Sequence, residues 1–236
     1  MSNEDFDSNA LATFLHLTPA QVEKMAERGK LPGRKVGGKW RFSQAEIHHW
    51  FETRIGVSDP TELIQVELML ERQPSESLAE TVRISDLMME SAMCIPLLAR
   101  TRNSVIQRLC DQASQAGVLW DANQLADLIR QREDLHPTAL ENGVALLHPR
   151  RPQPELMAEP FIALGVTTGG IPFGGPRGVL TDLFFLVASC DDAGHLKVLA
   201  RLSRLISNRD LLEHLRIAGS PKEAIAAIAK CEDAID

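Results

Sequence analysis

Residues 143–151 read GVALLHPRR, a short apolar run that ends directly in a histidine. A continuous run of aliphatic residues is typical of a strand that is buried on both faces, and the end of such a strand holds a side chain rigidly. A neutral imidazole is nucleophilic near neutral pH, so His148 is a candidate for a reversible phosphoryl acceptor. The alternative is a purely structural histidine, which fits a strand end equally well.

Helices and strands alternate on both sides of this stretch, from residue 82 onward. The predicted strands are Ala92–Leu97, Gly143–Leu147, Phe161–Thr167, Ile171–Phe173 and Val179–Ala188. The predicted helices span residues 102–116, 121–133, 193–206, 208–217 and 220–230. Because the β runs are continuous rather than alternating, we expect an α/β domain in which helices flank a mixed sheet on both faces.

Phosphoryl transfer needs positive or hydrogen-bonding groups around the phosphoryl oxygens. Arg132 or Arg150 can supply positive charge, and a second imidazole can hold an oxygen. The chain has seven histidines, but none has the paired spacing of a metal site such as His-Glu-x-x-His. We therefore expect neither a metal nor a cofactor.

Three blocks of this region carry a family resemblance. They are RE at 132–133 followed by PTALENGVALLH at 137–148, FGG at 173–175 followed by residues 179–186, and DDAGHL at 191–196 followed by LARL at 199–202. With them, residues 82–232 resemble the enzyme IIA domain of the fructose/mannitol and nitrogen-regulatory branch of the bacterial phosphotransferase system. The resemblance implies that His148 is the phosphoacceptor, that His195 is a second active-site histidine, and that Arg132 is a supporting cation.

The resemblance also implies an HPr-type phosphocarrier protein as the phosphoryl donor. His195 falls at the predicted opening of a helix, where free N–H groups favour an anion. The chain departs from the family pattern beside the acceptor, where Leu147 stands in place of the usual proline and Pro149 follows. Because proline fixes the backbone, we expect the loop beyond His148 to follow its own path.

Residues 8–54 predict a small helical domain with a hairpin. Ser8 or Asn9 can cap a first helix, and Thr18-Pro19-Ala20-Gln21 is a capping-box start for a second helix that ends at Gly29. Gly37-Gly38 lies between two short β runs, and Ser43-Gln44-Ala45-Glu46 opens a last helix. This order predicts a winged helix-turn-helix with a two-stranded wing.

The wing region is strongly basic. Six cations and no acid lie between residues 28 and 41, although the whole chain has a net charge of −7. Candidates for DNA contact are Gln21, Lys24 and Arg28 on the second helix and Arg34, Lys35, Lys39 and Arg41 on the wing. Two acids on the second helix, Glu23 and Glu27, weaken this interpretation. The alternative is a solvated loop on a small interaction module.

Within this domain, RGKLP at residues 28–32 and VGGKWRF at residues 36–42 resemble the excisionase/MerR-type winged helix-turn-helix family. The resemblance covers about 45 residues. It implies DNA binding through the second helix and the wing, commonly as a dimer or at tandem sites. We therefore assign residues 1–55 to a DNA-binding domain and residues 81–236 to the IIA-like domain.

Residues 56–80 form an acidic connector between these domains, with six acids and one arginine. Leu63, Val66 and Leu70 recur at helical spacing, so the pattern predicts an amphipathic helix. This apolar stripe can pack within the chain or pair with a second copy to make a homodimer.

Bulk properties limit the remaining possibilities. Hydrophobic residues make up 44% and charged residues 24%, which is an ordinary globular composition. The four cysteines show no C-x-x-C pair, the acidic start lacks the features of a signal peptide, and the longest apolar run, Leu183–Ala188, is too short to span a bilayer. We therefore expect a cytoplasmic protein without membrane insertion.

Together these patterns predict a phosphorylation-responsive transcription regulator in which charge gained at His148 alters DNA binding. A rival interpretation is a phosphotransferase-system component that relays phosphate to a sugar permease, with the N-terminal domain serving for protein contact. A third is an interaction protein that signals by its phosphorylation state alone.

Overall fold

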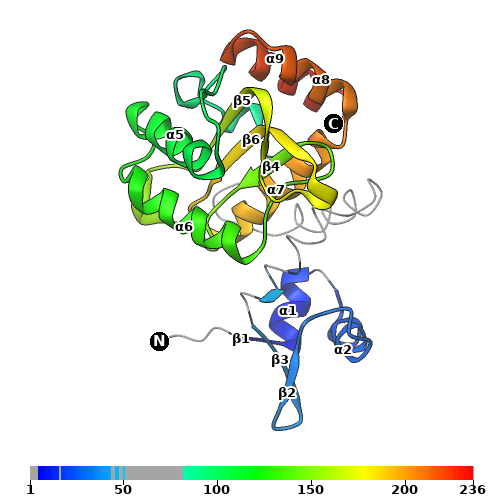
Figure 1. Ribbon diagram of the computed structural model, residues 1–236. Coiled ribbons are helices and arrows are strands. Elements are labelled where there is room, and N and C mark those ends of the chain that lie inside the picture. The colour runs from blue at the N-terminus through cyan, green and yellow to red at the C-terminus, as the bar shows by residue number, and fades with distance from the viewer. Residues whose placement is uncertain (1–4, 16, 44–45, 48–49, 51–81, 236) are drawn as a thin grey trace. The chain divides into compact units, whose positions relative to one another are not determined.

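The computed structural model describes residues 5–15, 17–43, 46–47, 50 and 82–235. The chain divides into two compact units, Met1–Thr81 and Val82–Asp236 (Figure 1). The predicted connector at residues 56–80 lies outside the described residues. So does part of the predicted capping box at residues 43–46. No helix among the described residues is long and apolar enough to cross a membrane.

The larger unit is built on a three-stranded mixed sheet. Its strands are β4 (Val144–Leu147), β5 (Phe161–Pro172) and β6 (Leu180–Ala188), in the order β4-β6-β5. β4 and β6 run parallel with Leu147 opposite Leu186, whereas β5 and β6 are antiparallel. The parallel pair is decisive for the site, because the carboxyl ends of β4 and β6 meet at the same edge of the sheet.

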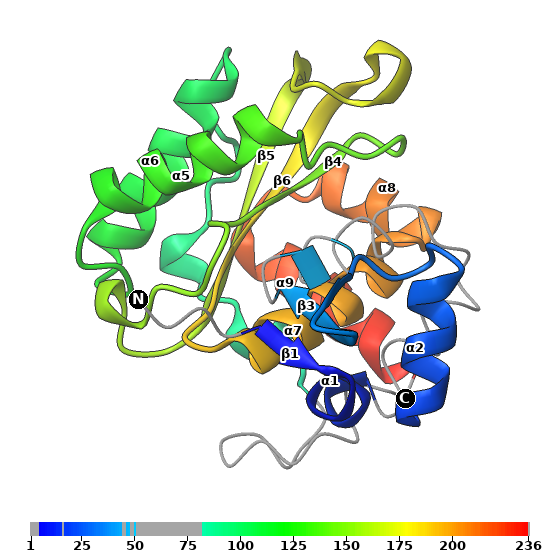
Figure 2. The same ribbon diagram turned by 90° about the horizontal axis from the view of Figure 1, so that it is seen from below.

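Helices cover both faces of this sheet, as the sequence predicts. They are α5 (Arg102–Gln115), α6 (Ala122–Leu135), α7 (Asp192–Ile206), α8 (Arg209–Ile217) and α9 (Pro221–Asp233). Figure 2 shows α5 and α6 on one side of the strands and α7, α8 and α9 on the other. Alternate residues of β6 explain the continuous apolar pattern: Phe184 and Leu186 belong to the core cluster shared with α5 and α6, whereas Phe185 between them faces the opposite way and is also buried.

Short 3-10 helices complete the larger unit. They are η1 (Ser85–Leu87), η2 (Glu90–Ala92), η3 (Pro154–Leu156) and η4 (Pro176–Gly178).

Three predicted strands differ from the structure. The predicted strand Ala92–Leu97 does not form a strand: after η2 it pairs with β5 at one bridge, between Cys94 and Gly165, and through a bond from the Leu97 N–H to the Val166 carbonyl. Pro96 has no N–H to donate, so a regular ladder does not continue through this segment. The predicted strands Phe161–Thr167 and Ile171–Phe173 are one strand, β5, whose pairing with β6 shifts register between Val166 and Ile171.

The smaller unit contains the predicted helix pair, α1 (Ser8–Leu15) and α2 (Pro19–Glu27). The capping box forms as expected: the Thr18 hydroxyl accepts from the Gln21 backbone N–H, and the Gln21 side chain accepts from the Thr18 backbone N–H. Gly29 adopts a φ of 67°, which ends α2. Val22 and Ala26 face the small core, where Phe42 is also fully buried.

The wing has one strand more than predicted. β2 (Arg34–Val36) and β3 (Lys39–Ser43) form the expected hairpin, but β1 (Asp5–Asp7) pairs antiparallel with the other edge of β3. The predicted two-stranded wing is confirmed, and β1 extends it to a three-stranded sheet in the order β1-β3-β2. Three residues are too few to give a strand pattern, and only the folded chain brings them beside β3.

Candidate functional site

His148 follows β4 directly, where the strand fixes its backbone. Its Nδ1 lies 2.8 Å from the carbonyl oxygen of Leu146. Because a carbonyl oxygen only accepts, Nδ1 carries the proton in the neutral ring, and Nε2 carries the lone pair. The side chain is buried, with 3% of its surface exposed. The local fold therefore leaves the lone pair of the neutral ring on Nε2.

His195 meets His148 across the end of the sheet. The two ring centroids are 5.2 Å apart, at an interplanar angle of 56°. His195 lies in the first turn of α7, which Asp191 caps through a bond from the Gly194 N–H. The helix begins just after β6, and β6 is the parallel neighbour of β4, so two distant histidines arrive at one edge.

Ser189 fixes the orientation of His195. Its hydroxyl lies 3.1 Å from Nδ1 of His195, and its backbone carbonyl accepts a bond of 3.1 Å from the Gln153 N–H. The second bond ties the loop after His148 to the residue that holds His195. Sequence reasoning missed Ser189, although its position between β6 and the helix-capping Asp191 was a usable signal.

Arg132 lies in the last turn of α6 and is 7% exposed. One of its guanidinium nitrogens donates to the backbone carbonyl of His136 at 2.5 Å. His136 is the residue that caps the end of α6. Arg150, the alternative cation, is exposed just beyond His148.

Glu133 belongs to the RE block at 132–133, but the sequence alone gave it no role at this site. Its carboxylate is fully buried and accepts from both the backbone N–H and the hydroxyl of Thr138. Burial raises the pKa of Glu133, while the Thr138 bonds and the nearby charges of His148 and Arg132 act in the opposite direction. A carboxylate thus lies within electrostatic reach of the candidate acceptor.

The predicted DNA-contact residues of α2 and its C-cap, Arg28, lie on the surface. Gln21, Lys24 and Arg28 are all exposed. The Gln21 side-chain oxygen, however, is already used by the Thr18 cap, which leaves its NH2 group for an outside partner. The turn after α2 is held by a bond of 2.7 Å from the Trp50 indole N–H to the carbonyl of Lys30.

The wing cations differ in what they contact. Arg34 pairs with Asp5 of β1 at 2.9 Å. Lys35 lies over the Trp40 ring, 5.0 Å from its centroid, and 4.0 Å from Glu27. Lys39 is exposed and Arg41 is half-buried. The structure thus places acids next to two of the four predicted wing contacts.

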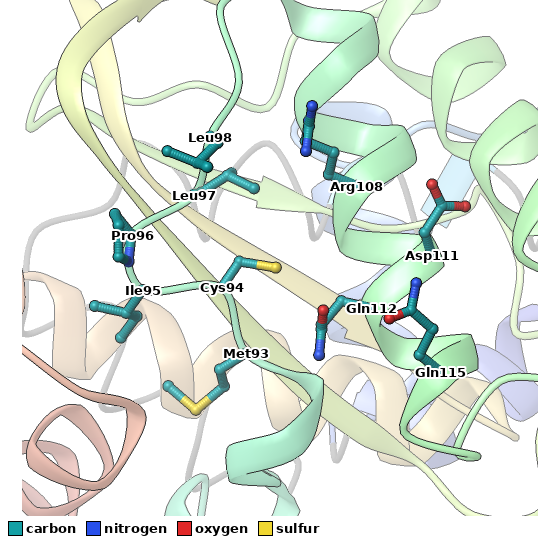
Figure 3. A pocket seen from close by; sticks show the side chains of 10 residues that line it. All are labelled: Met93, Cys94, Ile95, Pro96, Leu97, Leu98, Arg108, Asp111, Gln112 and Gln115. Atoms are coloured by element: carbon teal, nitrogen blue, oxygen red, sulfur yellow. The ribbon is translucent and has the colours of Figure 1, made fainter.

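A separate hollow of about 370 Å³ lies beside the outer edge of β5, away from β4 (Figure 3). One wall is the segment Met93–Leu98, and the other is formed by Arg108, Asp111, Gln112 and Gln115 of α5. Burial raises the pKa of its thiol, Cys94, to about 11, so this thiol is protonated and weakly nucleophilic at neutral pH. The hollow therefore lacks the chemistry found at His148.

Comparison with known proteins agrees with this arrangement. Residues 88–231 match the family model "Phosphoenolpyruvate-dependent sugar phosphotransferase system, EIIA 2", and residues 6–55 match a "Helix-turn-helix domain" model. A "Nitrogen regulatory protein" of Bradyrhizobium diazoefficiens is 31% identical over 150 residues, which cover 62% of this chain and 94% of that protein.

A "PTS system fructose-specific EIIABC component" of Bacillus subtilis is 26% identical over 154 residues, which cover 64% of this chain but only 24% of that longer protein. The solved structure of nitrogen regulatory protein IIA-Ntr from Neisseria meningitidis has a TM-score of 0.55 at 21% identity, with coverage of 61% of this chain and 98% of that one. It supports the fold of the larger unit. The chain belongs to the EIIA 2 family of the phosphoenolpyruvate-dependent sugar phosphotransferase system and carries a helix-turn-helix domain at its N-terminal end.

Proposed function

We propose that this protein is a phosphotransferase-linked regulator in which His148 accepts a phosphoryl group from a phosphorylated HPr-type carrier. One observation supports this most strongly: two buried imidazoles, with centroids 5.2 Å apart, meet at the carboxyl ends of adjacent parallel strands. In His148, Nδ1 donates its proton to the Leu146 carbonyl, so the lone pair lies on Nε2. The second ring and Arg132 are then the groups that contact the phosphoryl oxygens.

The chemistry is a direct transfer between two imidazoles. The N–P bond of the donor histidine breaks as a new N–P bond forms at Nε2 of His148, and the donor nitrogen keeps the electron pair. The proton on Nδ1 of His148 stays in its bond to the Leu146 carbonyl. Such a transfer depends mainly on positioning and on stabilisation of the phosphoryl charge.

Access to the acceptor requires movement. The Nε2 atoms of both His148 and His195 are inaccessible to solvent. A docking donor must therefore displace side chains that cover them before it comes within bonding distance. Gln153 anchors the loop after His148, because its N–H donates to the carbonyl of Ser189.

The helix-turn-helix domain supplies the proposed output. Lys24, Arg28 and Lys39 are exposed, and DNA phosphates would compete with Asp5 and Glu27 for Arg34 and Lys35. Phosphorylation adds about 1 to 2 negative charges at the larger domain near neutral pH, by analogy with other phosphorylated residues. We propose that this charge changes DNA binding by the N-terminal domain.

Labelling tests the acceptor. The full chain is incubated with a phosphorylated HPr-type carrier, and His148→Ala is compared with the wild type. We expect His148→Ala to lose all acid-labile label and His214→Ala, which changes an exposed histidine of α8, to retain it. Undiminished labelling of His148→Ala would place the acceptor elsewhere.

A DNA-binding assay tests the output. The wild type is expected to bind DNA with salt-sensitive affinity, and Lys39→Ala combined with Arg41→Ala is expected to weaken binding. Comparison of phosphorylated with unphosphorylated protein then shows whether the two domains communicate. An absence of DNA affinity in the wild type, at any salt concentration, would contradict the regulator.

A second candidate is a phosphocarrier that passes its phosphoryl group to a sugar permease. The similarity to part of a fructose-specific EIIABC component favours it. A chase with a IIB domain separates the two functions, because a carrier loses its label to that domain in seconds, whereas a dedicated regulator keeps it.

A further inference from the structure

We propose that Glu133 is a positioning residue for phosphoryl transfer: its buried carboxylate closes the turn at the end of α6 and thereby sets Arg132 and the end of β4 around His148. The inference rests on the proposed role of His148. It concerns a residue that contacts neither donor nor phosphoryl group but acts through its neighbours.

The first link is between Glu133 and Thr138. Both carboxylate oxygens of Glu133 lie close to the Thr138 backbone nitrogen, at 3.3 and 3.2 Å, and the Thr138 hydroxyl donates to one of them. Glu133 is fully buried and Thr138 is 9% exposed. These bonds close the residues between them into a fixed turn.

The second link runs from this turn to the acceptor strand. Just beyond Thr138, Ala139 bridges Ala145, and the Leu140 N–H donates to the Val144 carbonyl at 2.8 Å. The turn therefore lies against β4, which carries Leu146. A shift of Thr138 would therefore move β4 through the contacts of Ala139 and Leu140. β4 in turn carries the Leu146 carbonyl that orients the His148 ring.

The third link places Arg132. Within the same turn its guanidinium donates to the His136 carbonyl, and the His136 N–H donates back to the Arg132 carbonyl at 3.2 Å. Because Glu133 fixes both ends of the turn, it also fixes the cation proposed to contact the phosphoryl oxygens. Its own negative charge interacts with His148 and Arg132.

The electrostatics indicate a functional rather than a stabilising role. Burying a carboxylate opposes its ionisation, and burial is the largest influence on Glu133. A glutamine has nearly the same shape and carries no charge, but its amide nitrogen only donates, so it cannot approach the Thr138 N–H with two acceptor atoms as the carboxylate does. A carboxylate at this position is nevertheless costly to the fold, and groups of this kind concentrate at functional sites.

The test compares transfer with stability in the full chain. The variants are Glu133→Gln, Thr138→Val and Thr138→Ser, with Asp134→Asn as the matched control, since Asp134 is the next residue and its exposed carboxylate pairs with Arg102 on the surface. Rates of transfer from a phosphorylated HPr-type carrier are measured by rapid quench over a range of donor concentrations.

We expect Glu133→Gln and Thr138→Val to lower the maximal rate by about 10- to 100-fold with the KM for the donor unchanged, because small misplacements of reacting groups cost this much. Thr138→Ser and Asp134→Asn are expected to transfer at the wild-type rate. Glu133→Gln is expected to be as resistant to urea at pH 7.5 as the wild type, which a merely structural role does not predict.

Ring ¹⁵N signals of His148 separate this inference from the proposed function. If the wild type accepts no phosphoryl group, the proposed function fails, yet altered ring signals in Glu133→Gln still support positioning. Wild-type transfer rates, or wild-type ring signals, in both Glu133→Gln and Thr138→Val would overturn the inference. So would a loss of transfer that only follows a loss of stability.

Discussion

At the scale of the residue, the site is decided by which atoms of each side chain are already engaged. The Leu146 carbonyl holds Nδ1 of His148, and the Ser189 hydroxyl lies next to Nδ1 of His195, so both rings are oriented through the same nitrogen. Both imidazoles are nine-tenths buried or more. The arrangement resembles the supporting shell of other functional sites, where the partners of a reactive ring fix its tautomer.

Glu133 gives a residue-scale prediction about pH. Its pKa in the folded protein is raised above the ordinary value of 4.5 by burial, against the opposing influence of Thr138, His148 and Arg132. Above pH 4.5 the unfolded chain has lost this proton while the folded chain still holds it, so the free energy of unfolding falls as pH rises through this window.

The expected outcome is that the stability of Glu133→Gln relative to the wild type increases from pH 4.5 to pH 8. Urea unfolding at several pH values measures the difference, in which contributions of the other acids cancel. Glu155→Gln, at an exposed acid, is the control and is expected to give a constant difference. Parallel curves for Glu133→Gln and the wild type would contradict the argument.

At the scale of the element, the turn before β4 is held by α8, which covers the face of the sheet opposite to α5 and α6. Arg216 of α8 donates to both carboxylate oxygens of Asp182 in β6, at 2.8 and 3.1 Å, and to the Asn142 carbonyl at 2.7 Å. The Asn142 amide donates to the carbonyl of Ile206 at the end of α7. The strand that carries His148 therefore starts from a fixed point.

Gly143, within this turn, predicts a large cost of substitution. Its φ is 81°, and an added Cβ would lie 2.9 Å from an Arg216 nitrogen and 3.2 Å from an Asp182 oxygen. Gly117 has a φ of 80° with open space around it, so a substitution there measures the free-energy cost of the backbone conformation alone.

We expect Gly117→Ala to cost about 1 kcal/mol of unfolding free energy and Gly143→Ala about 2 to 3 kcal/mol, because the pinned Arg216 cannot move aside. Urea denaturation measures both losses. Equal losses in the two variants would show that Arg216 moves away from the added Cβ without a further loss of stability.

At the scale of the whole molecule, charge is unevenly distributed. The chain has a net charge of −7, yet all six charged residues between 28 and 41 are cations. The attraction to nucleic acid proposed above is therefore local, and it would work against the repulsion of the remaining chain. High salt weakens both effects, so the salt dependence of binding reports the number of phosphate contacts.

The prediction at this scale concerns that salt dependence. Lys39→Ala is expected to reduce the slope of log affinity against log salt by about 0.9, the value for one lost phosphate contact. Lys222→Ala, at an exposed lysine in α9, is expected to leave the slope unchanged. An equal reduction in both variants would mean that DNA contacts are not confined to the wing.

The sequence by itself determined most of the architecture. The capping box at Thr18, the glycine after α2, the basic hairpin and the apolar strands are local signals, and these elements form where their signals predict, apart from the predicted strand Ala92–Leu97 and the break predicted within β5. The strand-end position of His148 was also legible, because apolar runs and their ends are patterns of adjacent residues.

Only the tertiary structure decided what lies next to His148. The 5.2 Å approach of His195, the hydroxyl of Ser189 and the buried carboxylate of Glu133 come from segments separated in sequence. The same holds for β1, which becomes a strand only by pairing with β3. Parallel pairing of β4 with β6 brings two distant strand ends together, and side-chain bonds across such a junction leave no periodic trace in the chain.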